Sequence, residues 1–154
     1  MALDPTTSKA IANALAGGES YKFPTPYLGL LTKMPGTDGT GGEELSYPEY
    51  CRVSVTALGI EGKVIMAEAS TEAGTGDDEG KIIAYAANQE LIYFPDVDAV
   101  EDGYTQQVVG VAMYSSRTAT NPYLWGKLPE GSEVTVQKKS VPMIKLNNLK
   151  LTAK

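Results

Sequence analysis

Histidine is absent from this chain of 154 residues, and cysteine occurs once, as Cys51. Histidine is the commonest general base and metal ligand in proteins, and several catalytic and zinc-binding motifs cannot be built without it. The sequence therefore excludes Ser/His/Asp and Cys/His relays, HExxH proteases and CxxC…HxxxH zinc sites. A lone cysteine also excludes a disulfide within the chain. From these exclusions we single out no catalytic, cofactor-binding or metal-ligating residues.

Positive charge is scarce. Lysine and arginine number 13 against 19 acidic residues, which gives a formal charge of −6. This balance lacks the basic excess that drives binding to nucleic acid or to anionic lipid, so neither partner is expected. No stretch approaches the roughly 18 consecutive apolar residues of a membrane helix. The first residues lack a basic segment followed by an unbroken apolar run, which predicts a protein made and kept in a cytoplasm, or released by lysis.

Helical periodicity is confined to the first 20 residues. Ala10, Ile11, Ala14 and Leu15 fall on one helical face, a threonine or serine precedes them as a possible cap, and Gly17–Gly18 ends the pattern. A helix of about ten residues is too short to be stable alone. We therefore predict that residues 1–20 form an arm or short helix that needs a partner, as an anchoring or exchanged segment.

The remaining residues, 21–154, have the alternation and turn signals of strands. Cys51, Val53 and Val55 alternate with polar residues, which predicts a strand over 50–60 with Cys51 as a small buried side chain. Residues 106–116 form an apolar run typical of a strand buried on both faces. The other predicted strands cover 27–32, 63–69, 81–95, 123–128 and 133–153, with turns at 96–105 and 129–132. The pattern predicts an all-β fold, an antiparallel β-sandwich or barrel of about seven or eight strands in one domain.

The segment "KMPGTDGTGGEE", residues 33–44, contains five glycines and lies between two predicted strands. Gly36 and Gly41 have the G-x-x-x-x-G spacing of a phosphate-binding loop. That loop next requires a lysine and a serine or threonine at the start of a helix, whereas this chain continues with Gly42-Glu43. Phosphate binding is therefore not expected. The predicted connection, 33–49, is longer than ordinary hairpin loops, which indicates function or mobility.

Two acidic loops contain oxygen ligands of the kind that suit Ca²⁺. Neither loop has the spacing of a known calcium motif, and acidic turns on an acidic protein are usually solvated. Two carboxylates could also hydrolyse a glycoside, but 19 acidic residues produce such pairs by chance. The loop residues concerned are Asp38, Glu43 and Glu44, and Asp77, Asp78 and Glu79.

Tyr114, Tyr123 and Trp125 form an aromatic group late in the chain. Flat aromatic rings can stack on sugars, so these residues are candidates for a glycan-binding platform. Aromatic residues of this kind more often lie in a core or at a subunit contact, which is the interpretation that we prefer.

Residues 27–55 also carry a family motif: a strand Y-x-x-L-x-T, a proline, a glycine-rich loop that closes on a glutamate, and Y-x-R at the next strand. The motif positions are Tyr27, Leu30, Thr32, Pro35, Gly39, Gly41, Glu43, Tyr50 and Arg52. Later segments, "VVGVAMYSS", "YLWGKL" and "EGSEVTV…PMIKLNNLKL", agree with the same pattern. The sequence resembles a family of small virion proteins of tailed bacteriophages, known as tail-fibre, head-fibre or capsid decoration proteins.

The resemblance implies a non-enzymatic structural protein on the exterior of a tailed-phage virion, assembled in the host cytoplasm. It further implies a homo-oligomer, expected to be a trimer, that contacts the major capsid protein or another virion protein and stabilises the shell. We expect a capsid decoration or head-fibre protein. The alternatives are a tail-fibre module and a glycan-binding module that recognises the host surface.

Overall fold

The computed structural model describes residues 2–55, 70–73, 75–80, 82–145 and 148–153. The chain divides into two compact units, one made of residues 1–54 and 94–142 and the other of residues 55–93 and 143–154. Every described strand pair is antiparallel. The predicted all-β, antiparallel class with a short helix near the start is therefore confirmed. A closed sandwich or barrel, and a single domain over 21–154, stay predictions.

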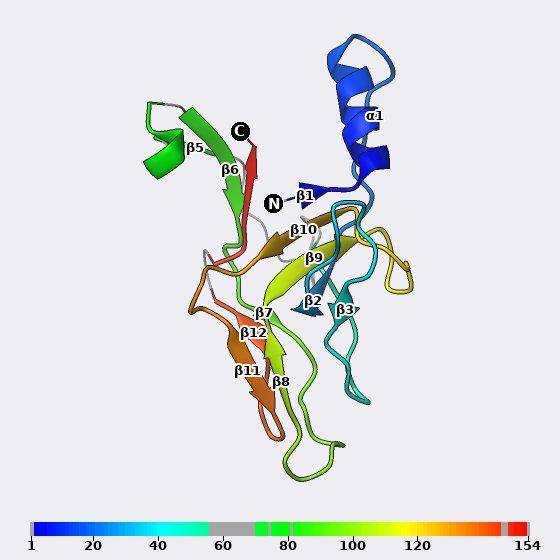
Figure 1. Cartoon of the computed structure of the whole chain (residues 1–154), viewed down its shortest axis with the longest axis vertical. Helices are drawn as coiled ribbons and strands as arrows, with labels where there is room; N and C mark the ends of the chain where they lie inside the picture. The colour runs from blue at the N-terminus through cyan, green and yellow to red at the C-terminus, as the bar shows by residue number, and fades with distance from the viewer. Residues whose placement is uncertain (1, 56–69, 74, 81, 146–147, 154) are drawn as a thin grey trace. The chain divides into compact units, whose positions relative to one another are not determined.

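The first unit is built on a six-stranded sheet (Figure 1). Its central strand, β2 (Tyr27–Lys33), was predicted from its apolar run, and four consecutive residues of it are buried. Strand β2 pairs with β9 (Gly110–Tyr114), which pairs in turn with β10 (Leu124–Lys127) and then the edge strand β1 (Ala2–Leu3). On its other side β2 pairs with two short strands, β3 (Glu43–Glu44) and β4 (Val53–Ser54).

The apolar run at 106–116 forms two strands instead of the predicted one. Strand β8 (Thr105–Val108) pairs with β11 (Val134–Gln137), and after Val109 the chain joins the main sheet as β9. The amide of Val109 donates a hydrogen bond to the carbonyl of Leu31, and its carbonyl accepts one from Leu128. The chain thus changes partners at Val109, which no local pattern indicates.

Helix α1 (Pro5–Leu15) is capped by Asp4, not by the predicted threonine or serine. Oδ1 of Asp4 accepts hydrogen bonds from the amides of Thr6 (2.9 Å) and Thr7 (3.1 Å), and proline at the first helical position lacks an amide that would need a partner. The predicted glycine stop is confirmed, because Gly17 adopts φ +86° and the amide of Gly18 bonds to Asn13.

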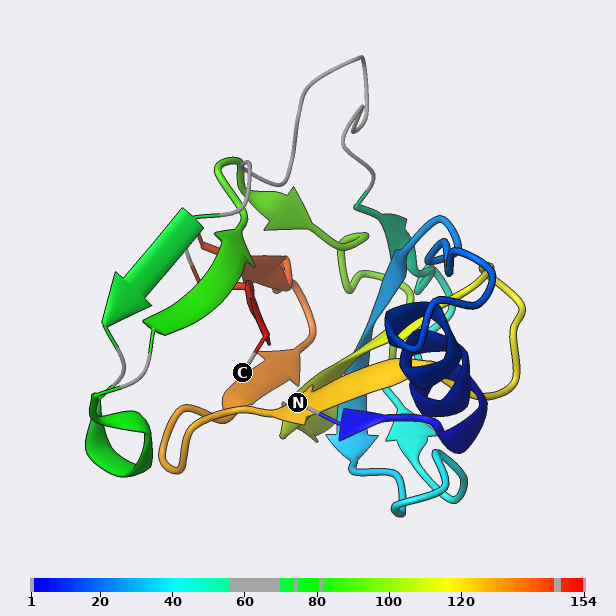
Figure 2. The same cartoon turned by 90° about the horizontal axis from the view of Figure 1, so that it is seen from above.

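The second unit contains a three-stranded sheet in the order β13 (Lys150–Ala153), β6 (Ile82–Ala87), β5 (Ser70–Ala73) (Figure 2). Strand β5 lies between the predicted strands at 63–69 and 81–95, where no strand was predicted. A 3₁₀ turn, η2 (Gly76–Asp78), follows it. Strand β7 (Ile92–Tyr93) pairs with β12 (Met143–Ile144). The strand predicted at 63–69 lies outside the described residues.

Asn88 connects two segments of the second unit through hydrogen bonds of its side chain. Its side chain is fully buried, donates to the carbonyls of Glu90 and Lys145, and accepts a hydrogen bond from the amide of Leu149. These bonds join the end of β6 to the segment that leads into β13. In the described ranges, no helix is long and apolar enough to cross a membrane.

Candidate functional site

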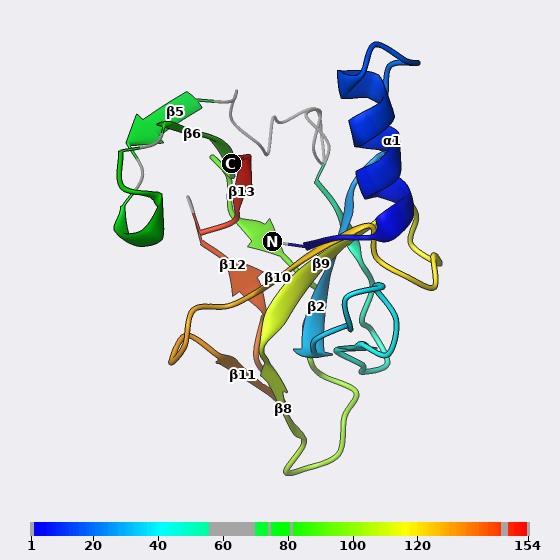
Figure 3. The ribbon, with the colours of Figure 1, turned by 45° about the horizontal axis from the view of Figure 1, so that its top comes forward.

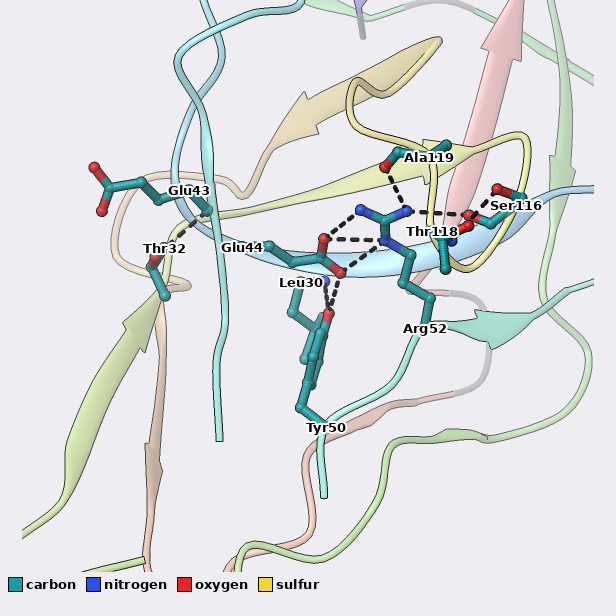
Figure 4. Close-up of polar contacts among 9 residues, drawn as sticks. All are labelled: Leu30, Thr32, Glu43, Glu44, Tyr50, Arg52, Ser116, Thr118 and Ala119. Carbon is teal, nitrogen blue, oxygen red and sulfur yellow. Dashed lines mark hydrogen bonds and ion pairs between the residues drawn. The ribbon is translucent and has the colours of Figure 1, made fainter. Parts of the chain in front are cut away.

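The densest polar site of the first unit is an ion pair between Glu44 on β3 and Arg52, next to β4 (Figure 4). Nε of Arg52 donates to both carboxylate oxygens of Glu44, at 3.1 and 3.0 Å, and Nη2 donates to Oε2 at 2.8 Å. The two side chains are only 11% and 19% exposed. Arginine suits this role because its planar group meets a carboxylate through several donors at once.

The opposite side of the guanidinium holds a loop after β9. Nη1 of Arg52 donates to the carbonyls of Ser116 (3.0 Å) and Ala119 (2.8 Å), and the guanidinium carbon lies 3.3 Å from the centre of the Tyr114 ring. The contact over the ring adds a cation–π attraction. Arg52 thus joins Glu44 on β3 to the segment at 114–119, which is distant in the sequence.

Tyr50 completes the group. Its hydroxyl donates to Oε1 of Glu44 at 2.7 Å and accepts a hydrogen bond from the amide of Leu30 on β2 at 2.8 Å. Burial raises the pKa of Tyr50, and the neighbouring Glu44 carboxylate raises it further. Burial, followed by Glu44, also raises the pKa of Tyr114 to about 12. We call Glu44, Tyr50, Arg52 and Tyr114 the Glu44–Arg52 cluster.

Two residues of the sequence motif, Tyr50 and Arg52, therefore meet in this cluster. Their acidic partner is Glu44 and not Glu43, whose exposed side chain forms an ion pair with Lys33 at 3.0 Å. Within the cluster, both carboxylate oxygens and all three guanidinium nitrogens of the pair bond to the protein itself. The arrangement holds strands together and leaves no charged group directed at a ligand.

The glycine-rich segment forms a compact turn over Trp125. The amide of Gly36 bonds to the carbonyl of Thr40, and the amide of Gly39 bonds to that of Gly36. A Cβ on Gly39 would lie 3.2 Å from the Trp125 indole, and the φ of Gly39 is +82°. Glycine is thus required at this position both by the backbone and by the ring beneath it. The turn covers a core side chain, and no helix follows it that could bind a phosphate.

A family model described as "Podophage GP4 fiber I protein gp80" matches residues 2–152. The chain belongs to this podophage fiber I family. It is therefore a phage fibre-type structural protein and a component of the virion, as the sequence resemblance implied. No curated protein sequence matches the chain.

The acidic residues considered as calcium ligands do not converge in this member of the fibre family. Asp38 accepts hydrogen bonds from the amide and hydroxyl of Thr40, which lower its pKa, while Glu43 pairs with Lys33 and Glu44 with Arg52. Asp77 and Asp78 lie in η2, and Glu79 follows it. In the part of the chain that the structure describes, no three acidic or cysteine side chains are grouped so that they could hold a metal ion.

Tyr114, Tyr123 and Trp125 are all buried, with at most 9% of each exposed. The preferred prediction was that these aromatic residues lie in a core or at a subunit contact, and the structure places them in the core. Their rings do not form an exposed platform for sugars in this structure. The prediction for Cys51 was wrong, because this residue is exposed and precedes β4, which begins only at Val53.

Proposed function

We propose that the chain is a non-enzymatic, oligomeric protein of the virion exterior that decorates the capsid as a head fibre or decoration protein and stabilises the shell. The family places the chain among fibre proteins, and the decoration role is the finer proposal. The Glu44–Arg52 cluster supports a structural role, because its hydrogen-bonding groups serve to join strands. The copies assemble from chains that accumulate in the host cytoplasm.

Exposed large apolar side chains carry the oligomeric part of the proposal. In the second unit, Tyr93 and Met143 lie opposite each other on β7 and β12, and they are 51% and 44% exposed. Covering such a pair with another surface is favourable, by about 25 cal/mol for each Å² of apolar area removed from water. Further large apolar side chains of this kind are Leu15, Phe23, Ile82, Val134 and Val141. Subunit contacts would bury these groups.

Electron cryo-microscopy of the intact virion tests the location. The proposal expects density for this fold on the head, in contact with the major capsid protein. Density only on the tail would overturn the head assignment in favour of a tail-fibre module, and absence from the particle would overturn the proposed virion role.

Native mass spectrometry of the purified chain tests the oligomer, for which we expect a trimer. Tyr93→Lys and Met143→Lys together should weaken the assembly, because each change places a charge in the proposed contact. Glu130→Lys, on an exposed turn residue, is the matched control and should leave the assembly intact. A wild-type chain that stays monomeric at high concentration would contradict the oligomeric proposal.

A further inference from the structure

Residues 2–15, which comprise β1 and α1 and are called the arm below, attach to the sheet of the first unit at its edge. Ala2 and Leu3 pair with Trp125 and Leu124 of β10, and the amide of Asp4 donates to the carbonyl of Tyr123 at 3.1 Å. This pairing occupies two residues of strand and uses main-chain groups. The pairing fixes the register of the arm on β10 and does not require a large buried surface.

Helix α1 contacts the rest of the first unit sparingly and projects away from the main sheet of that unit in two views (Figures 1 and 3). Thr7 is the one residue of this fully described helix that is buried, and Leu15 is 84% exposed. An open hollow of about 570 Å³ is lined by later residues of α1 and by the segment at 18–21. Helices of this length are marginal in water unless a surface covers their apolar face.

The connection between the arm and the body turns back along α1 before it reaches β2. Residues 16–26, between the end of α1 and the start of β2, form no helix or strand. Tyr21 lies 3.5 Å from the Thr7 hydroxyl, and Phe23, although it contacts Tyr123, remains more than half exposed. Opened out, a connection of eleven residues can span at most about 35–40 Å, which sets the reach of an exchanged arm.

We propose that, in the assembled protein, the arm of one copy pairs with β10 of a neighbouring copy. The segment that pairs with β10 of the neighbour is the arm of a second copy, because an identical arm makes the same main-chain bonds with β10 as the chain's own arm does. Exchange therefore retains the edge pairing and brings a second copy close to α1, whose apolar face a single chain leaves exposed. Exchange of identical elements is a low-cost route to oligomers. The inference rests on the proposed oligomer and specifies how its copies are joined.

Disulfide trapping distinguishes exchange within the oligomer from closure within one chain. In a Cys51→Ser background, Leu3→Cys and Leu124→Cys place two thiols at paired positions, and paired positions on adjacent strands have a Cα separation that a disulfide can span. The matched control is Gln107→Cys with Thr135→Cys, an exposed pair between β8 and β11. Non-reducing electrophoresis of the oxidised proteins should show covalent oligomers for the 3/124 pair and monomers for the 107/135 pair.

Co-expression gives a second readout. One chain carries Leu3→Cys alone, and a differently tagged chain carries Leu124→Cys alone, both in the Cys51→Ser background. The two chains should form a disulfide with each other. Thermal unfolding of each variant, compared with its background, verifies that the variants fold.

Native mass spectrometry separates this inference from the proposed oligomer. If the assembly stays oligomeric while the 3/124 disulfide closes within single chains, exchange is wrong and the oligomer stands. If the chain is monomeric throughout, both are wrong. If Leu3→Cys in the particle links instead to a different virion protein, the arm is an anchor and exchange is overturned.

Discussion

Gly29 on β2 lies so close to Glu44 that a Cβ at position 29 would collide with the Oε1 atom of the glutamate. The same Cβ would lie 3.0 Å from the Tyr114 ring. The backbone of Gly29 adopts no positive φ, so the requirement for glycine is steric and comes from the carboxylate and the ring. The Glu44–Arg52 cluster can form only because β2 presents no side chain at this point.

Gly29→Ala should therefore destabilise the first unit by about 1–3 kcal/mol, the usual cost of overpacking a filled interior. The added methyl group must displace the carboxylate from Tyr50 and Arg52, or move the strand. Chemical denaturation measures the change in the free energy of unfolding. In a Glu44→Ala background the same substitution should cost less, because the principal obstacle is gone. Equal costs in the two backgrounds would show that the carboxylate does not cause the effect.

Removing Arg52 should have a larger effect. Arg52→Ala removes the guanidinium donors from the Glu44 carboxylate, which keeps only the Tyr50 hydroxyl, and from two loop carbonyls. Breaking a largely buried ion pair in this way costs up to about 3–5 kcal/mol. Arg52→Lys should recover only part of the loss, because an ammonium cannot contact the carboxylate and both carbonyls in the same geometry. Denaturant unfolding of both variants provides the comparison.

Lys33→Ala is the control for this prediction, since it breaks the exposed pair between Lys33 on β2 and Glu43 on β3, the strand that also carries Glu44. Exposed pairs contribute about 0–1 kcal/mol, so the change should be small. Similar losses for Arg52→Ala and Lys33→Ala would contradict the distinction between the buried and the exposed pair.

The turn over Trp125 gives a prediction with an optical signal, because the chain contains a single tryptophan. Gly39→Ala places a methyl group against the indole at a backbone angle that alanine rarely adopts, at a cost of about 1–3 kcal/mol. The turn should lift, expose the ring and shift its fluorescence emission to longer wavelength. Gly41→Ala has a comparable φ of +72° but open space around the Cβ. Gly41→Ala should lower the stability without shifting the emission. An emission shift in both variants would contradict the proposed contact between residue 39 and the indole.

The fold was predictable where the pattern is local. The apolar run of β2 between turn residues indicated its strand, and Gly17–Gly18 indicated the end of α1. The change of partners at Val109 depends on Leu31 and Leu128, which no local pattern relates to it. At Cys51 the alternation with Val53 and Val55 was real, since both valines are buried, but the strand begins after the cysteine.

The candidate site was predictable only in part. The motif identified Tyr50 and Arg52, yet nothing in the sequence distinguishes Glu44 from Glu43 as their partner. That choice follows from the register of β3 on β2, where Glu44 lies opposite Leu31 and Glu43 opposite Lys33. The carbonyls of Ser116 and Ala119 could not be anticipated, because main-chain acceptors have no sequence signature.

Asn88 offers a test in the second unit. Asn88→Ala removes two donors and one acceptor and leaves their main-chain partners unsatisfied. Each buried group left without a partner should lower the free energy of unfolding by about 1–3 kcal/mol. Asn88→Asp keeps the shape but directs a carboxylate at two carbonyls, so it should not restore stability. Hydrogen exchange at the Leu149 amide should quicken in both variants. Glu90→Ala keeps its main-chain carbonyl and serves as the control, with little change expected.

Buried tyrosines predict a loss of stability in alkaline solution. Burial is the first cause that raises the pKa of three tyrosines to about 12, against an ordinary value near 10. Between these two values the unfolded chain has lost the phenolic protons and the folded chain retains them. Stability is therefore fully present below about pH 10 and falls as the pH rises towards 12. The three residues are Tyr47, Tyr114 and Tyr123.

Denaturant unfolding at a series of pH values, with tyrosinate absorbance recorded in parallel, measures this dependence. Tyr123→Phe removes one of the buried phenols while keeping the ring, so stability should fall less steeply between pH 10 and 12. Tyr93→Phe, measured at a protein concentration at which the chain is monomeric, changes a half-exposed ring and is the matched control, with the wild-type slope expected. A wild-type protein whose stability is constant over this interval would contradict the burial of the three hydroxyl groups, and equal slopes for the two variants would contradict the contribution of Tyr123.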